Sequence, residues 1–429
     1  MTELSLHTDP AARRRLRRRY AAERRFRLYG LVAIGIAMGA LSLLLGTVLW
    51  QGVPGFFAHE VELEVHFDPE RIDPEATGDP SVLARGDYGG LVKEALRRLF
   101  PSVEGRRARR QLTALVSSGA GFELRESVLR DPSLVGTTRS VAVPLSDEAD
   151  LYFKGQVDAE APATTRRLSD AQIGWLRALE AQGRIENRFW WRFFTGGDSR
   201  EPELAGIWGA VVGSIWTLVV TLALSLPLGV AAAIYLEEFA RRTRLNDFLE
   251  VNINNLAAVP SIVFGLLGLA VFLGFMGLPR SAPLVGGMVL ALMTLPTVII
   301  ASRAAIQAVP PSIREAALGV GASPVQVVFH HVLPLALPGI LTGTIIGMAR
   351  ALGETAPLLM IGMVAFIADL PSGPTSPATV LPVQVYLWAD SPERAFVAKT
   401  SAAILVLLSF LVAMNLSAVL LRGRFERRW

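Results

Sequence analysis

The chain has 429 residues, of which 51% are hydrophobic, and its formal net charge is +4. The absence of cysteine excludes disulfide bonds and thiolate metal sites. The apolar residues are gathered into runs of about 18 or more, long enough to cross a hydrocarbon core of about 30 Å as helices, which excludes a soluble globular protein.

Charge is distributed unevenly along the chain and predicts its orientation. The segment 51–207 carries a net charge of −5, whereas the remainder carries +9, with nine basic side chains in the tail 1–28. By the positive-inside rule, both termini and the segment 303–337 are expected in the cytoplasm. The basic tail abuts a span, so we expect a topology anchor that touches anionic membrane lipid, and no nucleic-acid partner.

The apolar runs predict an all-α polytopic membrane protein, because backbone amides in lipid must bond within their own helix. The first apolar run is longer than the apolar core of a secretory signal peptide. We therefore expect that it is not cleaved and is retained as the first transmembrane helix. The six predicted transmembrane helices lie at about residues 29–50, 207–236, 254–278, 283–302, 338–365 and 400–421.

The one long extramembrane insertion, residues 51–206, is expected outside the membrane as a separate domain of mixed α/β structure. Alternation at 61–67 predicts a strand, and the patterns at 91–100 and 168–183 predict helices, the second with a capping box of Ser169 and Gln172. The aromatic run 189–194, FWWRFF, predicts an aromatic belt at the membrane surface.

No catalytic residues and no metal site are predicted. His330 and His331 are adjacent, which turns their side chains to different faces of a helix. The phosphate-binding loop G-x-x-x-x-G-K-[ST] is absent, so we do not expect this chain to hydrolyse ATP or to hold a cofactor itself.

The cytoplasmic segment 309–338 has strong helix punctuation. Two prolines end the fourth span, Ser312 and Glu315 predict a capping box for a short helix, and Gly319 with Gly321 ends that helix. Ser323 and Gln326 then predict a second helix that ends before Pro334. The alanines at 316 and 317 leave a low surface for another protein, although the segment is equally compatible with an interfacial connector.

The stretch EAALGVGASPVQVVFHHVLP resembles the EAA motif of ABC importer permeases, with matches at Glu315, Ala316, Ala317, Gly321 and the Leu333-Pro334 pair. His331 stands where that motif has an apolar residue. The resemblance implies that the short helix is the coupling helix, seated in a groove of an ATPase subunit.

Three further stretches narrow the resemblance to the phosphate-specific ABC permeases, most closely to the second of their two permease types. They are VPSIVFGLLGL at 259–269, the run 291–323, and GMARALGETAPLL at 347–359. The likeness covers about residues 204–425, and the first 200 residues correspond to an N-terminally extended form for which it implies no activity. The expected divisions are a basic tail 1–28, a helix 29–50, the external domain 51–206, and a permease domain 207–425 with a coupling loop 304–337.

Arg350 and Glu354 lie inside the fifth apolar run. An arginine at a helix centre costs about 2.5–3.5 kcal/mol on insertion scales, so we expect Arg350 to line a bundle interior or a water-filled path. The planar guanidinium group of Arg350 presents several donors that suit a tetrahedral oxyanion. Glu354 would orient this group and weaken its binding of the anion. A purely structural ion pair is the alternative. Thr294 and Ser261 are further candidate pathway residues, for which packing is the alternative.

The resemblance also implies an assembly in the bacterial inner membrane. Its parts are a second permease in a heterodimer, two ATPase subunits that hold ATP and Mg, and an external phosphate-binding protein. Alternatives are a permease for sulfate or molybdate, a membrane sensor that uses the external domain, and an intramembrane hydrolase. The pairs Gly209/Gly213 and Gly343/Gly347 predict close helix packing, and Pro296 and Pro357 predict kinks.

Overall fold

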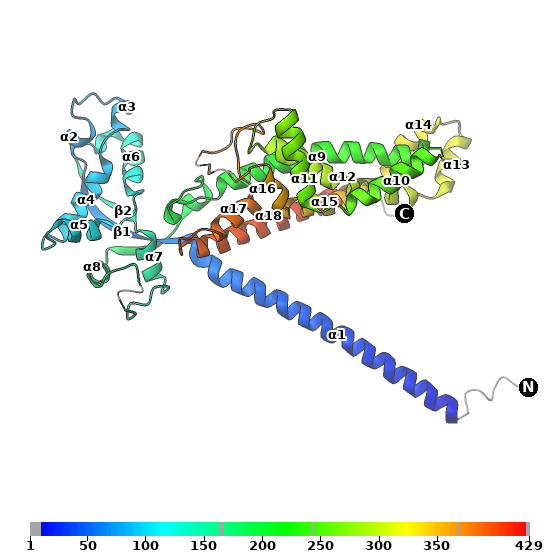
Figure 1. The fold of residues 1–429 in the computed structure, drawn as a ribbon, viewed down its shortest axis with the longest axis horizontal. Coiled ribbons are helices and arrows are strands. Elements are labelled where there is room, and N and C mark those ends of the chain that lie inside the picture. The colour runs from blue at the N-terminus through cyan, green and yellow to red at the C-terminus, as the bar shows by residue number, and fades with distance from the viewer. Residues whose placement is uncertain (1–9, 163–165, 242, 365, 368, 426–429) are drawn as a thin grey trace, which may run out of the picture. The chain divides into compact units, whose positions relative to one another are not determined.

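The computed structural model describes residues 10–162, 166–241, 243–364, 366–367 and 369–425, which divide into two compact units, 1–51 and 52–429. In the first unit, α1 (Pro10–Gly52) is one helix of 43 residues that contains the predicted span 29–50 and most of the basic tail (Figure 1). The ends of the chain at 1–9 and 426–429, part of the orientation prediction, lie outside the described residues.

Residues 57–189 form a mixed α/β domain, as predicted. Its three-stranded sheet has the order β2-β1-β3, and β1 is antiparallel to both neighbours, with Val61 paired to Val143 on one side and to Ile185 on the other. Its elements are β1 (Phe57–His66), α2 (Pro69–Ile72), α3 (Pro80–Leu83), α4 (Tyr88–Leu99), α5 (Arg106–Thr113), α6 (Ala120–Arg130), β2 (Thr138–Pro144), α7 (Asp147–Phe153), α8 (Asp170–Ala181) and β3 (Ile185–Phe189).

The predicted strand forms because its residues alternate. Val61, Leu63 and Val65 are fully buried on one face of β1, and helices α4 and α6 pack beside each other in the same core (Figure 1). The capping box of Ser169 and Gln172 is present at the start of α8. Local sequence signals therefore located β1, α4 and α8, and the remaining elements of the domain were not predicted.

The aromatic run 189–194 does not form a surface belt, so that prediction is wrong. Phe193 and Trp190 are buried, and Phe193 packs edge-on against Phe56, 5.5 Å between ring centroids. Only Trp191 is largely exposed, at 70%. The run instead joins a cluster with Trp388 of α17 (Leu381–Ala389), because tertiary contacts bury the rings more completely than a lipid surface would.

The permease region is mostly helical. Among the described residues of the whole chain, five helices are long and apolar enough to cross a membrane, one of them being α1, or up to six when one bent pair counts as a span. Its helices are α9 (Trp208–Ile234), α10 (Arg244–Ala257), α11 (Ser261–Leu267), α12 (Pro283–Gln307), α13 (Pro311–Gly319), α14 (Pro324–Gln326), α15 (Leu333–Gly353), α16 (Ala356–Met360), α17 (Leu381–Ala389) and α18 (Phe396–Phe425).

The third predicted span, 254–278, is not one straight helix. It divides into α10 and an apolar arm Ser261–Phe275, which meet at an angle of 105°. Pro260 causes the break, because its ring offers no N–H to continue α10 and instead stands at the N-cap of α11.

The fifth predicted span, 338–365, is displaced toward the N-terminus. The helix that begins after Ser323 passes through Pro334 and ends at Gly353, giving the span Pro324–Gly353. A π-helical segment, Val327–Val332, precedes the proline, and its wider turn accommodates the missing donor. The prediction that this helix ends before Pro334 is therefore wrong. Ala365, the expected end of the span, lies outside the described residues.

Helix α15 packs against α12 through a stripe of glycines, as the Gly343/Gly347 spacing predicted. A Cβ atom on Gly343 would lie 2.0 Å from that of Ala301, and one on Gly347 would lie 2.8 Å from Cγ2 of Thr294. Gly213 also has a close neighbour, the carbonyl of Thr379, but in a loop rather than a helix. Small residues let the two helix backbones approach where larger side chains would separate them.

Candidate functional site

Arg350 lies in the last turn of α15 and not at the middle of a continuous span, because the helix ends at Gly353. Glu354 has extended backbone angles at the C-cap, so the two residues do not share a helix face as expected. They still form an ion pair, with Nε of Arg350 3.5 Å from Oε1 of Glu354. This distance exceeds that of a strong charged hydrogen bond, about 2.7–2.9 Å, so the guanidinium keeps donors for another group.

The Arg350 side chain is exposed on the same side of α15 as Ile346, one turn earlier. Its exposed fraction is 53%, against 18% for Glu354, and Ile346 is 61% exposed. Its helix neighbours Gly347 and Ala351 are buried, so Arg350 lies at the edge of the packed glycine stripe. About half of the side chain is left uncovered by the residues that the structure describes, and in a membrane that half requires a second protein surface or water.

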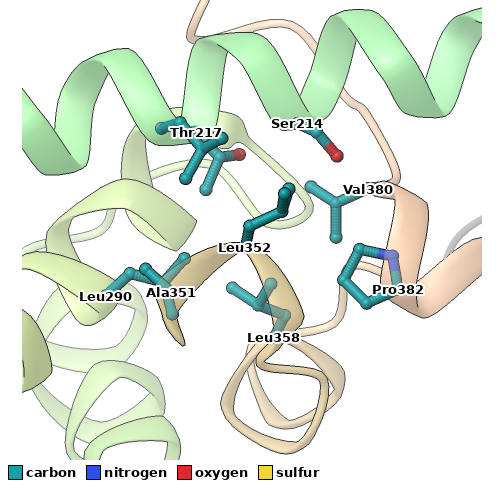
Figure 2. A pocket seen from close by; sticks show the side chains of 9 residues that line it. Ser214, Thr217, Leu290, Ala351, Leu352, Leu358, Val380 and Pro382 are labelled. Atoms are coloured by element: carbon teal, nitrogen blue, oxygen red, sulfur yellow. The ribbon is translucent and has the colours of Figure 1, made fainter. Parts of the chain in front are cut away.

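The packed side of the same turn encloses only a small void, between α9, α12, α15 and α16 (Figure 2). Its volume is about 10 Å³, close to the lower limit for one water molecule. Ala351 and Leu352 line it, and the hydroxyl of Ser214 is already used, accepting from the backbone N–H of Leu381 at 2.8 Å. An oxyanion does not fit there, which leaves the exposed face of α15 as the candidate pathway surface.

Thr294 is buried and its hydroxyl group is already hydrogen-bonded, whereas Ser261 stays a candidate pathway residue. Thr294 is 3% exposed, its hydroxyl donates to the carbonyl of Leu290 at 2.6 Å, and its methyl group faces Gly347. Ser261 is half-buried in the first turn of α11. In this chain Thr294 packs α12 and α15 together at Gly347.

The coupling segment forms the expected short helix, α13, but with a different start. Pro310 occupies the N-cap, and no side chain caps the helix, so the predicted capping box of Ser312 and Glu315 is absent. The helix begins at Pro311, which is favoured at the first helical position, so Ser312 lies inside the first turn and not at the N-cap. The second predicted box, Ser323 with Gln326, is present.

Helix α13 divides its EAA residues between two faces. Glu315 and Ala316 are exposed, whereas Ala317 is 5% exposed and packs inward. Gly321 follows the helix with φ of +89°, a left-handed conformation that favours glycine. Leu318 and Val320, 50% and 85% exposed, add apolar surface beside Glu315. The result is a small mixed surface of the kind that binds a protein partner.

An ionic cluster, which sequence analysis missed, holds α13 to the end of α9. Arg314 donates to Glu238 (Nη2 to Oε1, 2.7 Å) and to two backbone carbonyls, of Val309 at 2.7 Å and of Ile306 at 2.9 Å. The exposed fractions of the Arg314 and Glu238 side chains are 23% and 12%. We name this pair the α13 clamp.

A second arginine extends the cluster. Arg303 of α12 contacts Glu237 and, at 3.0 Å, Glu250 of α10, and Gln307 also donates to Glu237 at 2.8 Å. The adjacent glutamates at 237 and 238, directly after an apolar run, were the available sequence signal. Their arginine partners lie more than 60 residues away in the chain, so only the tertiary structure identifies them.

No group of three or more His, Asp or Glu side chains that could hold a metal ion occurs among the described residues. His330 and His331 are both exposed on the π-helical segment before α15.

Two family models match the chain. The model described as binding-protein-dependent transport system inner membrane component matches residues 225–429, and a domain of unknown function (DUF3333) matches residues 13–163. The first covers all of α10 to α18. The second covers α1 and much of the external domain.

Curated relatives match the permease half. The phosphate transport system permease protein PstA 1 of Mycobacterium tuberculosis is 31% identical over 241 residues, which cover 56% of this chain and 78% of that protein. The probable ABC transporter permease protein YqgI of Bacillus subtilis is 30% identical over 242 residues, 53% of this chain and 81% of that protein. A chain of the inward-facing MetNI methionine ABC transporter aligns with a TM-score of 0.42 at 17% identity, over 52% of this chain and 95% of that chain.

Proposed function

The chain belongs to the family of phosphate transport system permease proteins, and we propose that it forms one wall of an inorganic phosphate pathway across the bacterial inner membrane. It is a transport subunit and not a catalytic enzyme. In our proposal the other wall is a second permease, two ATPase subunits with ATP and Mg bind below, and an external phosphate-binding protein delivers the ligand. Both termini and the coupling loop 304–337 face the cytoplasm.

The single observation that carries the pathway proposal is the position of Arg350. Its guanidinium is half exposed at the end of α15, its pair with Glu354 is loose, and the packed side of the helix has no room for an anion. A charged group with free donors and no cover of its own matches a surface that a passing oxyanion contacts. Glu354 competes for the same donors, which keeps the anion from being held so firmly that it cannot leave.

Uptake of radiolabelled phosphate by cells or liposomes that hold the assembled complex tests this role. Arg350→Gln should reduce uptake to background while the complex assembles normally, because the amide has no charge to offer the anion. Arg280→Gln is the matched control, since Arg280 is exposed in a loop after the Ser261–Phe275 arm. Unimpaired uptake by Arg350→Gln would remove Arg350 from the pathway. Uptake of radiolabelled sulfate or molybdate, without uptake of phosphate, would favour the alternative oxyanions.

We propose that α13 is the element on which the ATPase acts, with Glu315, Ala316 and Gly321 at the contact and Ala317 supporting the helix from inside. The α13 clamp gives this helix a rigid connection to α9, because Arg314 uses its donors on one carboxylate and two carbonyls. A push on α13 therefore moves the end of α9 with it. This connection supports transmission of ATPase movement to the membrane helices.

A charge exchange tests the α13 clamp as a positioning device. Arg314→Glu and Glu238→Arg should each uncouple ATP hydrolysis from phosphate uptake, since each places like charges together in a part-buried site, at a cost of roughly 1–3 kcal/mol. The double exchange restores the ion pair but not the hydrogen bonds to the carbonyls of Val309 and Ile306, so it should recover only a part of the coupling ratio. If the single variants kept normal coupling, or the double variant were no better than either, Arg314 would have only a structural role. Glu315→Ala should uncouple without any rescue.

A sensor that uses the external domain is the second class of function left open by the sequence. Co-purification separates the two classes. A permease should co-purify with an ATPase, and this association should depend on Glu315. A sensor should co-purify with a kinase or an adaptor.

A further inference from the structure

The external domain contains two adjoining hollows between α4, α5 and α6. Their volumes are about 330 Å³ and 210 Å³, and they share three lining residues, Gly89, Ser118 and Gly121. They lie outside residues 225–429, which the transport-system family model matches. None of the residues proposed for the pathway or for coupling lines them.

Three cations line the hollows without a carboxylate partner among the described residues. Lys93 of α4 and Arg110 of α5 line the larger one, and Arg125 of α6 lines the smaller. Nearby cations of the same domain do pair, such as Arg98 with Glu94 at 2.6 Å. The segment 51–207 has a net charge of −5, so this cluster runs against the charge of its own domain.

Arg125 gives the second observation. Its Nε atom is buried and has no hydrogen-bond partner, and its guanidinium carbon lies 5.0 Å from the ring centroid of Phe122. A buried charged donor without an acceptor is unfavourable. An anion in the adjoining hollow would supply a compensating charge.

The backbone adds two free donors. Gly89 and Gly121 stand at the second positions of α4 and α6, where a helix has no internal acceptor, and neither N–H has a partner among the described residues. A Cβ atom on Gly121 would lie 3.0 Å from the nitrogen of Gly89, so the starts of the two helices meet at these glycines. Both helix dipoles therefore place partial positive charge beside the hollows.

One carboxylate opposes an anion there. Asp87 lines the smaller hollow, and its Oδ1 atom accepts from the N–H of Gly90 at 2.9 Å, which caps α4. Because that carboxylate is already engaged, three cations and two helix starts outweigh it in the hollow.

We propose that these hollows bind a small tetrahedral oxyanion outside the membrane, which makes the external domain an anion-binding domain. The choice of inorganic phosphate as the ligand rests on the proposed function, whereas the positive character of the hollows does not. A bound phosphate would accept from Lys93, Arg110 and Arg125 and from the glycine N–H groups. Such a site would sense the concentration of the anion outside the membrane, or would raise that concentration beside the permease region.

Equilibrium dialysis of the purified full-length chain against radiolabelled phosphate tests the proposal. Lys93→Gln, Arg110→Gln and Arg125→Gln should each raise the Kd by roughly three- to tenfold, which corresponds to the loss of one charged contact. Gly89→Ala should also weaken binding, because a Cβ there meets nothing within 4 Å and adds a methyl group beside the hollow without a clash. Binding should weaken as ionic strength rises.

Controls separate this site from general basicity and from the pathway. Arg106→Gln and Arg107→Gln, exposed on α5 but outside the hollows, should leave the Kd unchanged. Arg350→Gln should abolish phosphate uptake but leave phosphate binding to the hollows unchanged. The two measurements therefore test the pathway proposal and the anion-site proposal separately. If the variants at Lys93, Arg110 and Arg125 bound phosphate as tightly as the wild type, the inference would be overturned. If the chain bound glycerol phosphate but not inorganic phosphate, the ligand would be a lipid headgroup, and the proposal of a free anion would be overturned.

Discussion

The external domain and the permease helices bury their apolar residues in different ways. In the external domain, large side chains such as Leu63, Leu96 and Phe67 are at most 1% exposed within one continuous core. In the permease region, helices touch through glycines, while large side chains such as Ile346 and Val219 remain 61% and 50% exposed. A water-soluble fold must complete its core within the chain, whereas a membrane helix leaves its outer face to lipid and to neighbouring subunits.

The same difference separates the two candidate anion sites. The hollows of the external domain are lined by helices and loops of this chain, which supply the donors that we propose for the anion. Arg350 is half exposed, and in our proposal its site is completed by a second permease. The first can be measured on the isolated chain, and the second requires the assembled complex.

The largest effect is expected from a matched pair of truncations. Leu63→Ala removes a fully buried side chain from β1 and should destabilise the external domain by about 2–5 kcal/mol. Ile346→Ala, on the exposed face of α15, should change stability by less than about 0.5 kcal/mol in the isolated chain. Pulse proteolysis of the full-length chain over a urea series measures both. Similar losses from the two variants would contradict the comparison.

A glycine exchange tests the packing within the permease region. Gly343→Ala should destabilise the α12 and α15 pair by about 1–3 kcal/mol, because its Cβ would lie 2.0 Å from that of Ala301. Gly353→Ala is the control, since a Cβ there meets nothing within 4 Å. Thermal unfolding in detergent, followed by tryptophan fluorescence, gives the difference. If both variants melted with the wild type, the glycine contact would not be needed.

The smallest effect concerns pH. Burial raises the pKa of Glu203 to about 7, and its Oε2 atom is buried without a partner. Because the folded-state pKa exceeds the unfolded value of 4.5, the folded state binds more protons between these values, and stability falls as pH rises from about 4.5 to 7. Glu203→Gln should therefore stabilise the chain by roughly 1–2 kcal/mol at pH 8 and change little at pH 4. Melting curves at both pH values measure this, and an equal shift at both would exclude titration of Glu203.

Sequence alone predicted what depends on neighbouring residues. The alternation of β1, the capping boxes at Ser169 and Ser323, the short helix α13 and the apolar runs are all local signals, and each corresponds to an element of the structure. The family resemblance also followed from contiguous stretches, and the relatives confirm it. Local backbone preference and apolar periodicity determine these features wherever the chain later folds.

Tertiary structure decided the features that depend on distant residues. The passage of the helix through Pro334 and its end at Gly353 depend on how the surrounding structure accommodates a missing donor, which a propensity does not contain. The α13 clamp and the hollows between α4, α5 and α6 likewise join charges far apart in the sequence. The packing of the helices determines which partner a charged residue has and how exposed it is. The sequence therefore predicts a pathway role for Arg350, whereas only the fold shows how exposed its side chain is.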